Sequence, residues 1–292
     1  MTSHNLFPLD TPIQELQFEP ISTKGNRLFM KRDDLIHPFV SGNKWRKLKY
    51  NVEEAQKQGK KVIATFGGAY SNHLIATAAA AASLGLASIG YVRGEELGPA
   101  SNVILRLCHE FDMDLRFVSR SEYNHKEEIA SKLQSDDIYI VPEGGANELG
   151  IRGCADILSD VEGFEHIVLA VGTGTTMRGL IRKTGFVAKV HGIAALQGAG
   201  YLRESIGCES GNWQLHTDYS FGGFGKFDAE QVEFNRSFTK ATGILLDPVY
   251  TGKMMRGLVH LVATNQITES KILCIHTGGL TGILSDKWLK NQ

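Results

Sequence analysis

Short apolar runs rich in β-branched residues alternate with helix-like stretches along most of this 292-residue chain. Parallel strands need a long crossover between them, usually a helix, so this alternation predicts an α/β protein with parallel sheets. Several of the runs are apolar throughout, which is typical of strands covered on both faces. The strand-like runs cover residues 61–68, 88–94, 114–119, 138–145, 166–174, 191–196, 244–250 and 272–279, and helices are predicted over 72–84, 102–111, 147–161, 229–241 and 253–264.

Four of the strand-like runs end in glycine-rich turns, with the sequences FGGAYSN, PEGGAN, AVGTGTT and IHTGG. In open α/β sheets ligands bind at the carboxyl ends of strands, where backbone amides and helix N-termini converge. We therefore expect the ligand site to be built from these four turns.

The charge balance excludes one large class of partner. Lysine and arginine number 31 against 32 aspartates and glutamates, so the sequence carries no basic field that would attract nucleic acid. The first residues have neither the basic start nor the apolar core of a leader, and no apolar run is long enough to cross a bilayer. We therefore expect a cytoplasmic protein with neither a nucleic acid nor a membrane as partner.

Several familiar signatures are missing from the sequence. The run 172–177 lacks the third glycine of the dinucleotide fingerprint, and neither GxxxxGK[ST] nor a GxSxG elbow occurs. The ten histidines contain no HExxH and no pair at helical spacing, so no metal is expected. The cysteines match no zinc or CxxC spacing and are expected to be reduced; they are Cys108, Cys154, Cys208 and Cys274.

The loop formed by Gly172, Thr173, Gly174, Thr175 and Thr176 has the composition of a phosphate-binding turn. Glycines let backbone amides approach an anion, hydroxyl groups add donors, and the following helix N-terminus adds partial positive charge. The alternative is that glycine and threonine only turn the chain and cap the helix.

Two further segments carry groups that a carbonyl cofactor would use. Lys44 follows a Gly-Asn turn, where it is either one more solvated lysine or an amine that can form a Schiff base with pyridoxal phosphate. Ser71 and Asn72 precede an alanine-rich helix, and one of them is expected to be its N-cap. An asparagine amide also donates to a phenolate oxygen, and a serine binds a carboxylate or relays a proton, so both kinds of role are compatible.

Taken in order, six motifs resemble the 1-aminocyclopropane-1-carboxylate deaminase and D-cysteine desulfhydrase family: SGNKWRKL, GGAYSNH with its alanine-rich helix, PEGGAN, VGTGTTMRG, DPVYTGKMM and HTGG. Members of that family are pyridoxal-phosphate enzymes of the tryptophan-synthase-β fold. The resemblance implies two open, parallel-sheet, three-layer α/β domains with the cofactor in the cleft between them. It also implies a large domain of residues 1–47 and 158–292, a small inserted domain of residues 48–157, and a homodimer that acts on a small amino acid.

The resemblance assigns roles to individual residues of this chain. Lys44 would form the Schiff base and take the α-proton, and Tyr250 would stand over the reacting atoms. Ser71, a further catalytic candidate, and His73 would lie beside the substrate carboxylate. The cofactor would be held by Asn72 at its ring oxygen, by Gly172, Thr173, Gly174, Thr175 and Thr176 at its phosphate, and by Thr251 and Thr277 near its pyridine nitrogen. The substrate would meet Ser71, Asn72, His73, Phe224 and Tyr250.

Three departures from the family pattern bear on the reaction. Residues 74–76, Leu-Ile-Ala, replace the family's Arg-Gln-Thr, which removes a cation near the helix start. Phe224 falls where a second active-site tyrosine is usual, and Thr251 stands where a true cyclopropane deaminase has a glutamate. A neutral hydroxyl holds a proton on the pyridine nitrogen less well than a carboxylate does, so the ring would be a weaker electron sink.

The predicted activity is therefore β-elimination from D-cysteine or a related D-amino acid, giving a keto acid, ammonia and, from cysteine, sulfide. Ring opening of 1-aminocyclopropane-1-carboxylate is the alternative reaction. A third possibility, motivated by the altered residues at 74–76 and 224, is a non-catalytic protein that binds pyridoxal phosphate or an amino acid.

Overall fold

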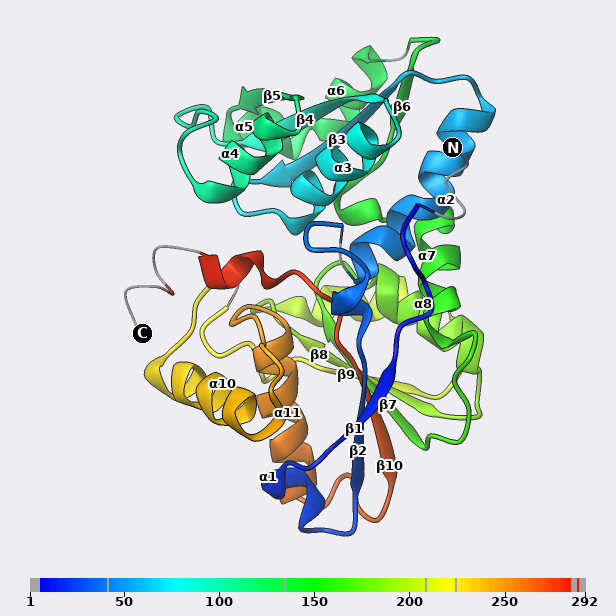
Figure 1. Ribbon diagram of the computed structural model, residues 1–292, viewed down its shortest axis with the longest axis vertical. Coiled ribbons are helices and arrows are strands. Elements are labelled where there is room, and N and C mark those ends of the chain that lie inside the picture. The colour runs from blue at the N-terminus through cyan, green and yellow to red at the C-terminus, as the bar shows by residue number, and fades with distance from the viewer. Residues whose placement is uncertain are drawn as a thin grey trace.

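The computed structural model describes residues 6–40, 42–133, 135–207, 209–223, 225–284 and 288, and within them two separate sheets (Figure 1). The smaller sheet has the strand order β5-β4-β3-β6, and all of its strand pairs are parallel. Its strands are β3 (Val62–Gly68), β4 (Ala87–Arg93), β5 (Met113–Val118) and β6 (Ile138–Ile140).

The larger sheet takes its strands from both ends of the chain, in the order β1-β2-β10-β7-β8-β9. Its edge strand β1 pairs antiparallel with β2, and the remaining pairs are parallel. The strands are β1 (Ile13–Leu16), β2 (Arg27–Lys31), β7 (His166–Val171), β8 (Lys189–Ala194), β9 (Trp213–His216) and β10 (Lys271–Ile275). The predicted α/β class with open parallel sheets is confirmed, with one antiparallel edge strand added.

Helices pack on both faces of the larger sheet, which explains why its inner strands are apolar throughout. In β7, Ile167 and Leu169 belong to the core that includes α8, whereas Val168 and Ala170 belong to the core that includes α11. The helices are α1 (Glu19–Ser22), α2 (Asn43–Lys57), α3 (Asn72–Ser83), α4 (Val103–Glu110), α5 (Arg120–Asn124), α6 (Lys126–Lys132), α7 (Glu148–Ala155), α8 (Thr175–Thr184), α9 (Leu202–Gly207), α10 (Ala229–Thr242) and α11 (Thr251–Ala263). In the described part of the chain, no helix combines the length and the apolar composition needed to cross a membrane.

Some elements differ from the sequence-based expectation. Residues 244–250 form no strand, because side chains take up their backbone carbonyls: Asn235 Nδ2 donates to the oxygen of Leu246 at 3.0 Å, and His276 Nε2 donates to that of Leu245 at 2.8 Å. The strands β1, β2 and β9 have no counterpart among the predicted runs. The predicted boundary between residues 47 and 48 falls inside α2, and the domain limits stay a prediction.

The cysteines within the described residues follow their prediction. Cys108, Cys154 and Cys274 are buried and form no disulfide, and Cys208 lies outside the described residues.

Glycines let three helices pack with their backbones in contact between the two sheets. A β-carbon at Gly153, on α7, would collide with the carbonyl oxygen of Arg46 on α2. A β-carbon at Gly179, on α8, would lie 2.5 Å from the carbonyl oxygen of Ile151 on α7. This packing brings the first turn of α2 close to the first turn of α8, and Figure 1 shows α2 and α7 running between the two sheets.

Three histidines form a hydrogen-bonded row across adjacent strands of the larger sheet. His166 Nδ1 lies 2.9 Å from His191 Nε2, and His191 Nδ1 lies 3.1 Å from His216 Nε2. Burial lowers the pKa of His191 to about 3 and that of His216 to about 4, with neighbouring positive charge adding to the effect. The two rings are therefore neutral at pH 7, and each can donate one hydrogen bond and accept another.

We expect this row to make the fold sensitive to acid. An unfolded histidine takes up a proton near pH 6.5, whereas His191 and His216 stay neutral in the folded chain until about pH 4, so unfolding is favoured as the pH falls through this window. As the pH falls, each of the two lowers the free energy of unfolding by up to about 1.4 kcal/mol per pH unit, a limit approached near pH 5. Urea unfolding of wild type and His191→Gln between pH 7 and pH 5 should show a shallower loss of stability in the variant.

The absolute stability of His191→Gln will fall at every pH, because its neighbours lose hydrogen bonds, so the slope against pH is the relevant quantity. His109→Gln, which changes an exposed histidine of α4, is the control for loss of a surface imidazole. Equal slopes in wild type and His191→Gln would contradict the prediction.

Candidate active site

The glycine-rich turns after β3, β6, β7 and β10 come together in the fold, as predicted. A β-carbon at Gly279 would lie 2.8 Å from Asn72 Nδ2, which joins the turn after β10 to the one after β3. A β-carbon at Gly144 would lie 3.1 Å from Thr173 Cγ2, which joins the turn after β6 to the one after β7. The four turns thus form one surface at the carboxyl ends of the strands, where open α/β sheets bind ligands.

Lys44 lies in the first turn of α2, and that turn is fastened to the end of β10. Gly42 adopts φ 59°, and a β-carbon there would collide with the carbonyl oxygen of Thr277, so the position requires glycine. The amide of Asn43 donates to the same oxygen at 3.2 Å, and its Nδ2 donates to Thr176 Oγ1 at 2.9 Å. These bonds place Lys44 between the turn after β10 and the first turn of α8.

The surroundings of Lys44 lower the pKa of its amine. Its Nζ donates to Asn43 Oδ1 at 2.9 Å. Burial first and the neighbouring ammonium of Lys47 second lower the pKa of Lys44 to about 7. A neutral amine is therefore available near neutral pH, which is the form that acts as a nucleophile or as a base.

Lys47 is a second lysine of this site and was not anticipated from the sequence. It is only 4% exposed, and within the described residues its ammonium makes neither a hydrogen bond nor an ion pair. Its side chain packs against Gly145 of the turn after β6, where a β-carbon would lie 2.9 Å from Lys47 Cβ. The signal that could have revealed it is its spacing of three from Lys44, which places both lysines on one side of the helix.

The loop 172–176 turns directly into α8. Gly174 is left-handed at φ 80° and is the N-cap of the helix, and Thr175 and Thr176 in the first turn are buried. The hydroxyl oxygens of Thr173 and Thr175 lie 3.0 Å apart. The loop therefore turns the chain into the helix, as the alternative predicts, and also offers hydroxyl groups and a helix N-terminus to an anion. Binding of a phosphate by residues 172–176 stays a prediction.

Tyr250 lies over this loop. A β-carbon at Gly172 would lie 3.3 Å from Tyr250 Cε1, so the glycine makes room for the ring. Burial raises the pKa of the phenol, and the carboxylates of Asp247 and Glu143 add to the rise, which keeps Tyr250 protonated at neutral pH.

Asp247, which the sequence analysis did not single out, fixes the start of α11. Its Oδ1 accepts the amides of Val249 and Tyr250, and its Oδ2 accepts the amide and the hydroxyl of Thr251 at 2.8 Å each. Thr251 Oγ1 in turn accepts the amide of Asp247 at 2.9 Å. The hydroxyl proton of Thr251 is thus committed to Asp247, and the role of Thr251 beside a pyridine nitrogen stays a prediction.

The start of α3 resolves one of the alternatives left by the sequence. Ser71 is the N-cap, because its Oγ accepts the amides of His73 at 3.2 Å and Leu74 at 3.3 Å. Asn72 is the first residue of the helix and packs against Gly279. The proton of the Ser71 hydroxyl is used by neither of these two bonds, so capping leaves a donor for a ligand.

His73 is buried behind this turn. Thr65 Oγ1 donates its proton to the carbonyl of Val141 at 2.8 Å, so it accepts from His73 Nε2 at 2.9 Å. The remaining ring nitrogen, Nδ1, is then an acceptor that has no hydrogen-bond partner among the described residues. Burial and the lysines at 44 and 47 lower the pKa of the ring to about 3, so at neutral pH the ring carries one proton, which Nε2 donates to Thr65. The predicted place of His73 beside the substrate carboxylate stays a prediction.

The residues that depart from the family pattern lie in different surroundings. Leu74, Ile75 and Ala76 are fully buried in the core of the smaller sheet, so this segment fills space between α3 and its neighbours. Phe224 lies outside the described residues. Thr277 is buried, and its carbonyl is the oxygen that accepts the amide of Asn43.

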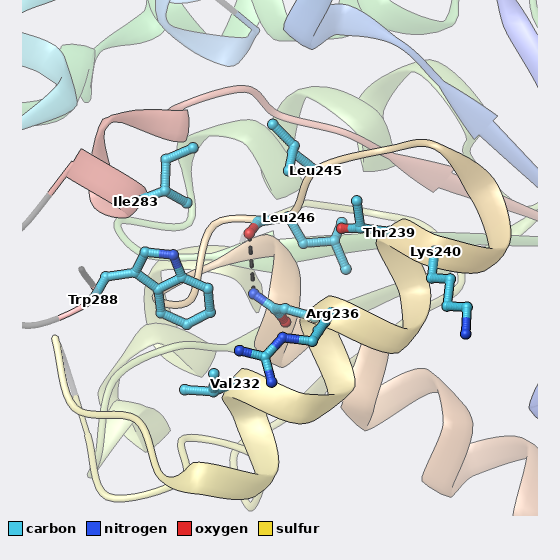
Figure 2. Close-up of a pocket in the computed structure, with 9 residues that line it drawn as sticks. Val232, Arg236, Thr239, Lys240, Leu245, Leu246, Ile283 and Trp288 are labelled. Atoms are coloured by element: carbon cyan, nitrogen blue, oxygen red, sulfur yellow. Dashed lines mark hydrogen bonds between the residues drawn. The ribbon is translucent and has the colours of Figure 1, made fainter. Parts of the chain in front are cut away.

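A separate cavity of about 330 Å³ lies beside α10 (Figure 2). It is lined by side chains that include Val232, Arg236, Leu246 and Trp288, and its described lining includes none of the predicted site residues. The convergence of the four glycine turns, and not this cavity, marks the candidate active site.

Comparison with known sequences gives a consistent result. Residues 5–278 match the family described as "Pyridoxal-phosphate dependent enzyme". A protein of Pyrococcus horikoshii named "Putative 1-aminocyclopropane-1-carboxylate deaminase" is 34% identical over 303 residues, which cover 95% of this chain and 91% of that protein. The "Bifunctional D-cysteine desulfhydrase/1-aminocyclopropane-1-carboxylate deaminase, mitochondrial" of Arabidopsis thaliana is 30% identical and covers 96% of this chain and 78% of its own length.

Comparison with solved structures agrees with the sequence matches. The crystal structure of an ACC deaminase homologue superposes with a TM-score of 0.85 at 31% identity, covering 98% of this chain and 95% of that one. A hydrogen sulfide-producing enzyme of Fusobacterium nucleatum, at 16% identity, shares the fold with a TM-score of 0.68 over 93% of this chain and 96% of its own.

Proposed function

Because the chain belongs to the pyridoxal-phosphate dependent enzyme family, we propose that it is a lyase that removes the β-substituent of D-cysteine or a related D-amino acid. D-cysteine and water give pyruvate, ammonia and hydrogen sulfide, so the atoms balance without an oxidant or reductant. Pyridoxal phosphate, when bound, supplies a covalent link to the substrate amine and an acceptor for the electrons of the α-carbon. The observation that carries the choice of reaction is the hydrogen bonding of Thr251.

The described residues fit the phosphate end of this cofactor. Lys47 is buried, burial lowers the pKa of its amine, and no described carboxylate forms an ion pair with it. A buried ammonium is costly unless an anion offsets its charge, so a phosphate would be stabilised here. The N-terminus of α8 and the turn at Gly174 direct backbone donors toward the same region. In our proposal the phosphate is held by residues 172–176 and by the ammonium of Lys47.

Lys44 is the proposed base. With a pKa of about 7 it is roughly half neutral at pH 7, and the neutral amine can take a proton from the substrate α-carbon. The hydrogen bond from Nζ to Asn43 Oδ1 orients that amine.

Groups on the other two sides of the site complete the proposed arrangement. Ser71 has a hydroxyl proton to donate to the substrate carboxylate, and Asn72 has a side-chain amide for the cofactor ring oxygen. Tyr250, held over Gly172 by the bonds of Asp247, is protonated and can donate its phenolic proton at the reacting atoms.

The preference for elimination follows from the charge at residue 251. Thr251 is neutral, and its hydroxyl proton goes to Asp247, whose two oxygens already accept hydrogen bonds from the start of α11. Neither group therefore offers a free carboxylate to keep a pyridine nitrogen protonated, and the electron sink stays weak. A thiol at the β-carbon leaves more readily than a ring carbon does, so elimination is favoured over ring opening.

Ring opening of 1-aminocyclopropane-1-carboxylate is the second candidate, because relatives at 34% and 30% identity carry that activity in their names. Both candidates need the same lysine and the same phosphate site. They differ in the group that leaves, so a direct comparison of substrates separates them.

The first prediction concerns Lys44. Lys44→Ala should abolish the borohydride-reducible link between protein and pyridoxal phosphate and lower turnover by about 10³-fold or more, because both the covalent attachment and the base are removed. Mass spectrometry after borohydride reduction checks the link. Lys57→Ala, an exposed lysine at the end of the same helix, is the control, and a link that persists in Lys44→Ala would disprove the assignment.

The second prediction concerns the phosphate loop. Gly174→Asp should weaken pyridoxal phosphate binding by about 10- to 100-fold, because it adds a negative charge and a side chain at a left-handed position. Gly174→Asn has a similar shape without the charge and should lose less. Equal dissociation constants for Gly174→Asp and wild type, measured by fluorescence titration, would place the phosphate elsewhere.

The third prediction concerns the substrate. D-cysteine and β-chloro-D-alanine should yield pyruvate and ammonia, with kcat/KM about 10-fold or more above that for 1-aminocyclopropane-1-carboxylate. Steady-state assays of keto acid release, with L-cysteine as the stereochemical control, measure this. Faster turnover of the cyclopropane would favour the deaminase, and inertness toward every substrate with the cofactor bound would favour a binding protein.

A further inference from the structure

The loop between β9 and α10 is attached to α11 by a buried lysine. Lys253 is 0% exposed, and its Nζ donates to the carbonyl oxygen of Ser220 at 2.7 Å and to that of Gly223 at 2.6 Å. Hydrogen bonds from a charged donor are the stronger kind, and two of them converge here on one short loop. The ammonium therefore holds the backbone of the loop directly.

Three consecutive residues of this loop have a backbone conformation that needs support from neighbouring groups. Phe221, Gly222 and Gly223 all have positive φ, at 43°, 92° and 103°. A left-handed conformation at a phenylalanine is uncommon and persists only where the surroundings enforce it. Removing the ammonium would leave two carbonyls without their charged donor at this strained turn.

Two more side chains of α11 contact the same loop. The guanidinium of Arg256 lies 3.9 Å from the centroid of the Phe221 ring, and His260 Nδ1 lies 2.9 Å from the hydroxyl of Tyr219. Lys253, Arg256 and His260 follow the helical spacing of three and four residues, so they share one face of α11. Residues 219–223 are therefore held against one face of α11.

This face of α11 begins beside the candidate active site. Lys253 is in the first turn of α11, three residues after Tyr250, whose backbone Asp247 fixes. The loop also reaches the carboxyl end of β8, because a β-carbon at Gly223 would lie 3.4 Å from Cβ of Gln197. The loop thus stands at the strand ends, where the substrate of a parallel-sheet enzyme enters.

We propose that Lys253 is a positioning residue that fixes the loop 219–223 at the mouth of the site and so determines how tightly the amino-acid substrate is held. The inference rests on the proposed function for its kinetic readout. It assigns Lys253 no contact with cofactor or substrate.

The test compares holoenzyme variants by two independent measurements. Lys253→Ala should speed hydrogen exchange in residues 217–223 and raise KM for D-cysteine by about tenfold, with kcat and the cofactor absorption band little changed. Adding butylammonium should reverse both effects, because it returns an ammonium to the vacated space, whereas butanol should not. Lys24→Met, which removes a lysine bound to the carbonyl of Ala263 at the other end of α11, is the control for loss of a lysine contact.

The experiment distinguishes a failure of the role proposed for Lys253 from a failure of the proposed function. Unchanged exchange in the loop, or faster exchange with unchanged KM, would overturn the role of Lys253. A general loss of cofactor and fold that butylammonium does not reverse would show a structural role only, and would also overturn it. If wild type does not turn over D-cysteine, the proposed function fails, and the affinity for whichever amino acid shifts the cofactor band replaces KM in the same comparison.

Discussion

The contact between Gly42 and the carbonyl of Thr277 determines where the reactive side chains lie. Only a residue without a β-carbon fits against that oxygen, and the backbone there is left-handed. The next amide, that of Asn43, donates to the same oxygen, so the start of α2 is fixed to the end of β10. Because Lys44 and Lys47 follow within one turn, this backbone contact places two amines beside the N-terminus of α8.

The electrostatics of the site follow from those two lysines in one buried turn. Burial lowers the pKa of both, and the charge of Lys47 lowers that of Lys44 further. Asp247 opposes the change at Lys44, but its oxygens already accept hydrogen bonds from the first turn of α11. The positive charge of Lys47 thus keeps the Lys44 amine partly neutral, and in our proposal the same charge favours a bound phosphate.

Helices that begin at a capping residue could be predicted from the sequence. Segments whose conformation is fixed by hydrogen bonds from residues far away in the sequence could not. The helices α3 and α10 begin where Ser71 and Asp228 accept first-turn amides, as capping residues do. Residues 244–250 have the composition of a strand, yet Asn235 and His276 bond their carbonyls across long stretches of sequence, and no local pattern encodes those partners. The glycine turns could be predicted to meet in two pairs, because β3 with β6 and β7 with β10 are parallel neighbours whose carboxyl ends share one edge of a sheet. That the two pairs face each other depends on how the two sheets pack, which no local pattern encodes.

Helix α11 connects the candidate active site to the loop 219–223, which in our proposal lies at the mouth of the site. Asp247 accepts the amides of Tyr250 and of Thr251, the first residue of the helix. The buried Lys253 donates to the carbonyls of Ser220 and Gly223, and Met254 and Leu258 pack in the core. A helix packed in this way transmits displacement and does not absorb it, because interiors are dense. In our proposal, attachment and proton transfer depend on α2, whereas selection of the substrate depends on α11, so changes along α11 would alter specificity while the chemistry proposed for Lys44 is retained.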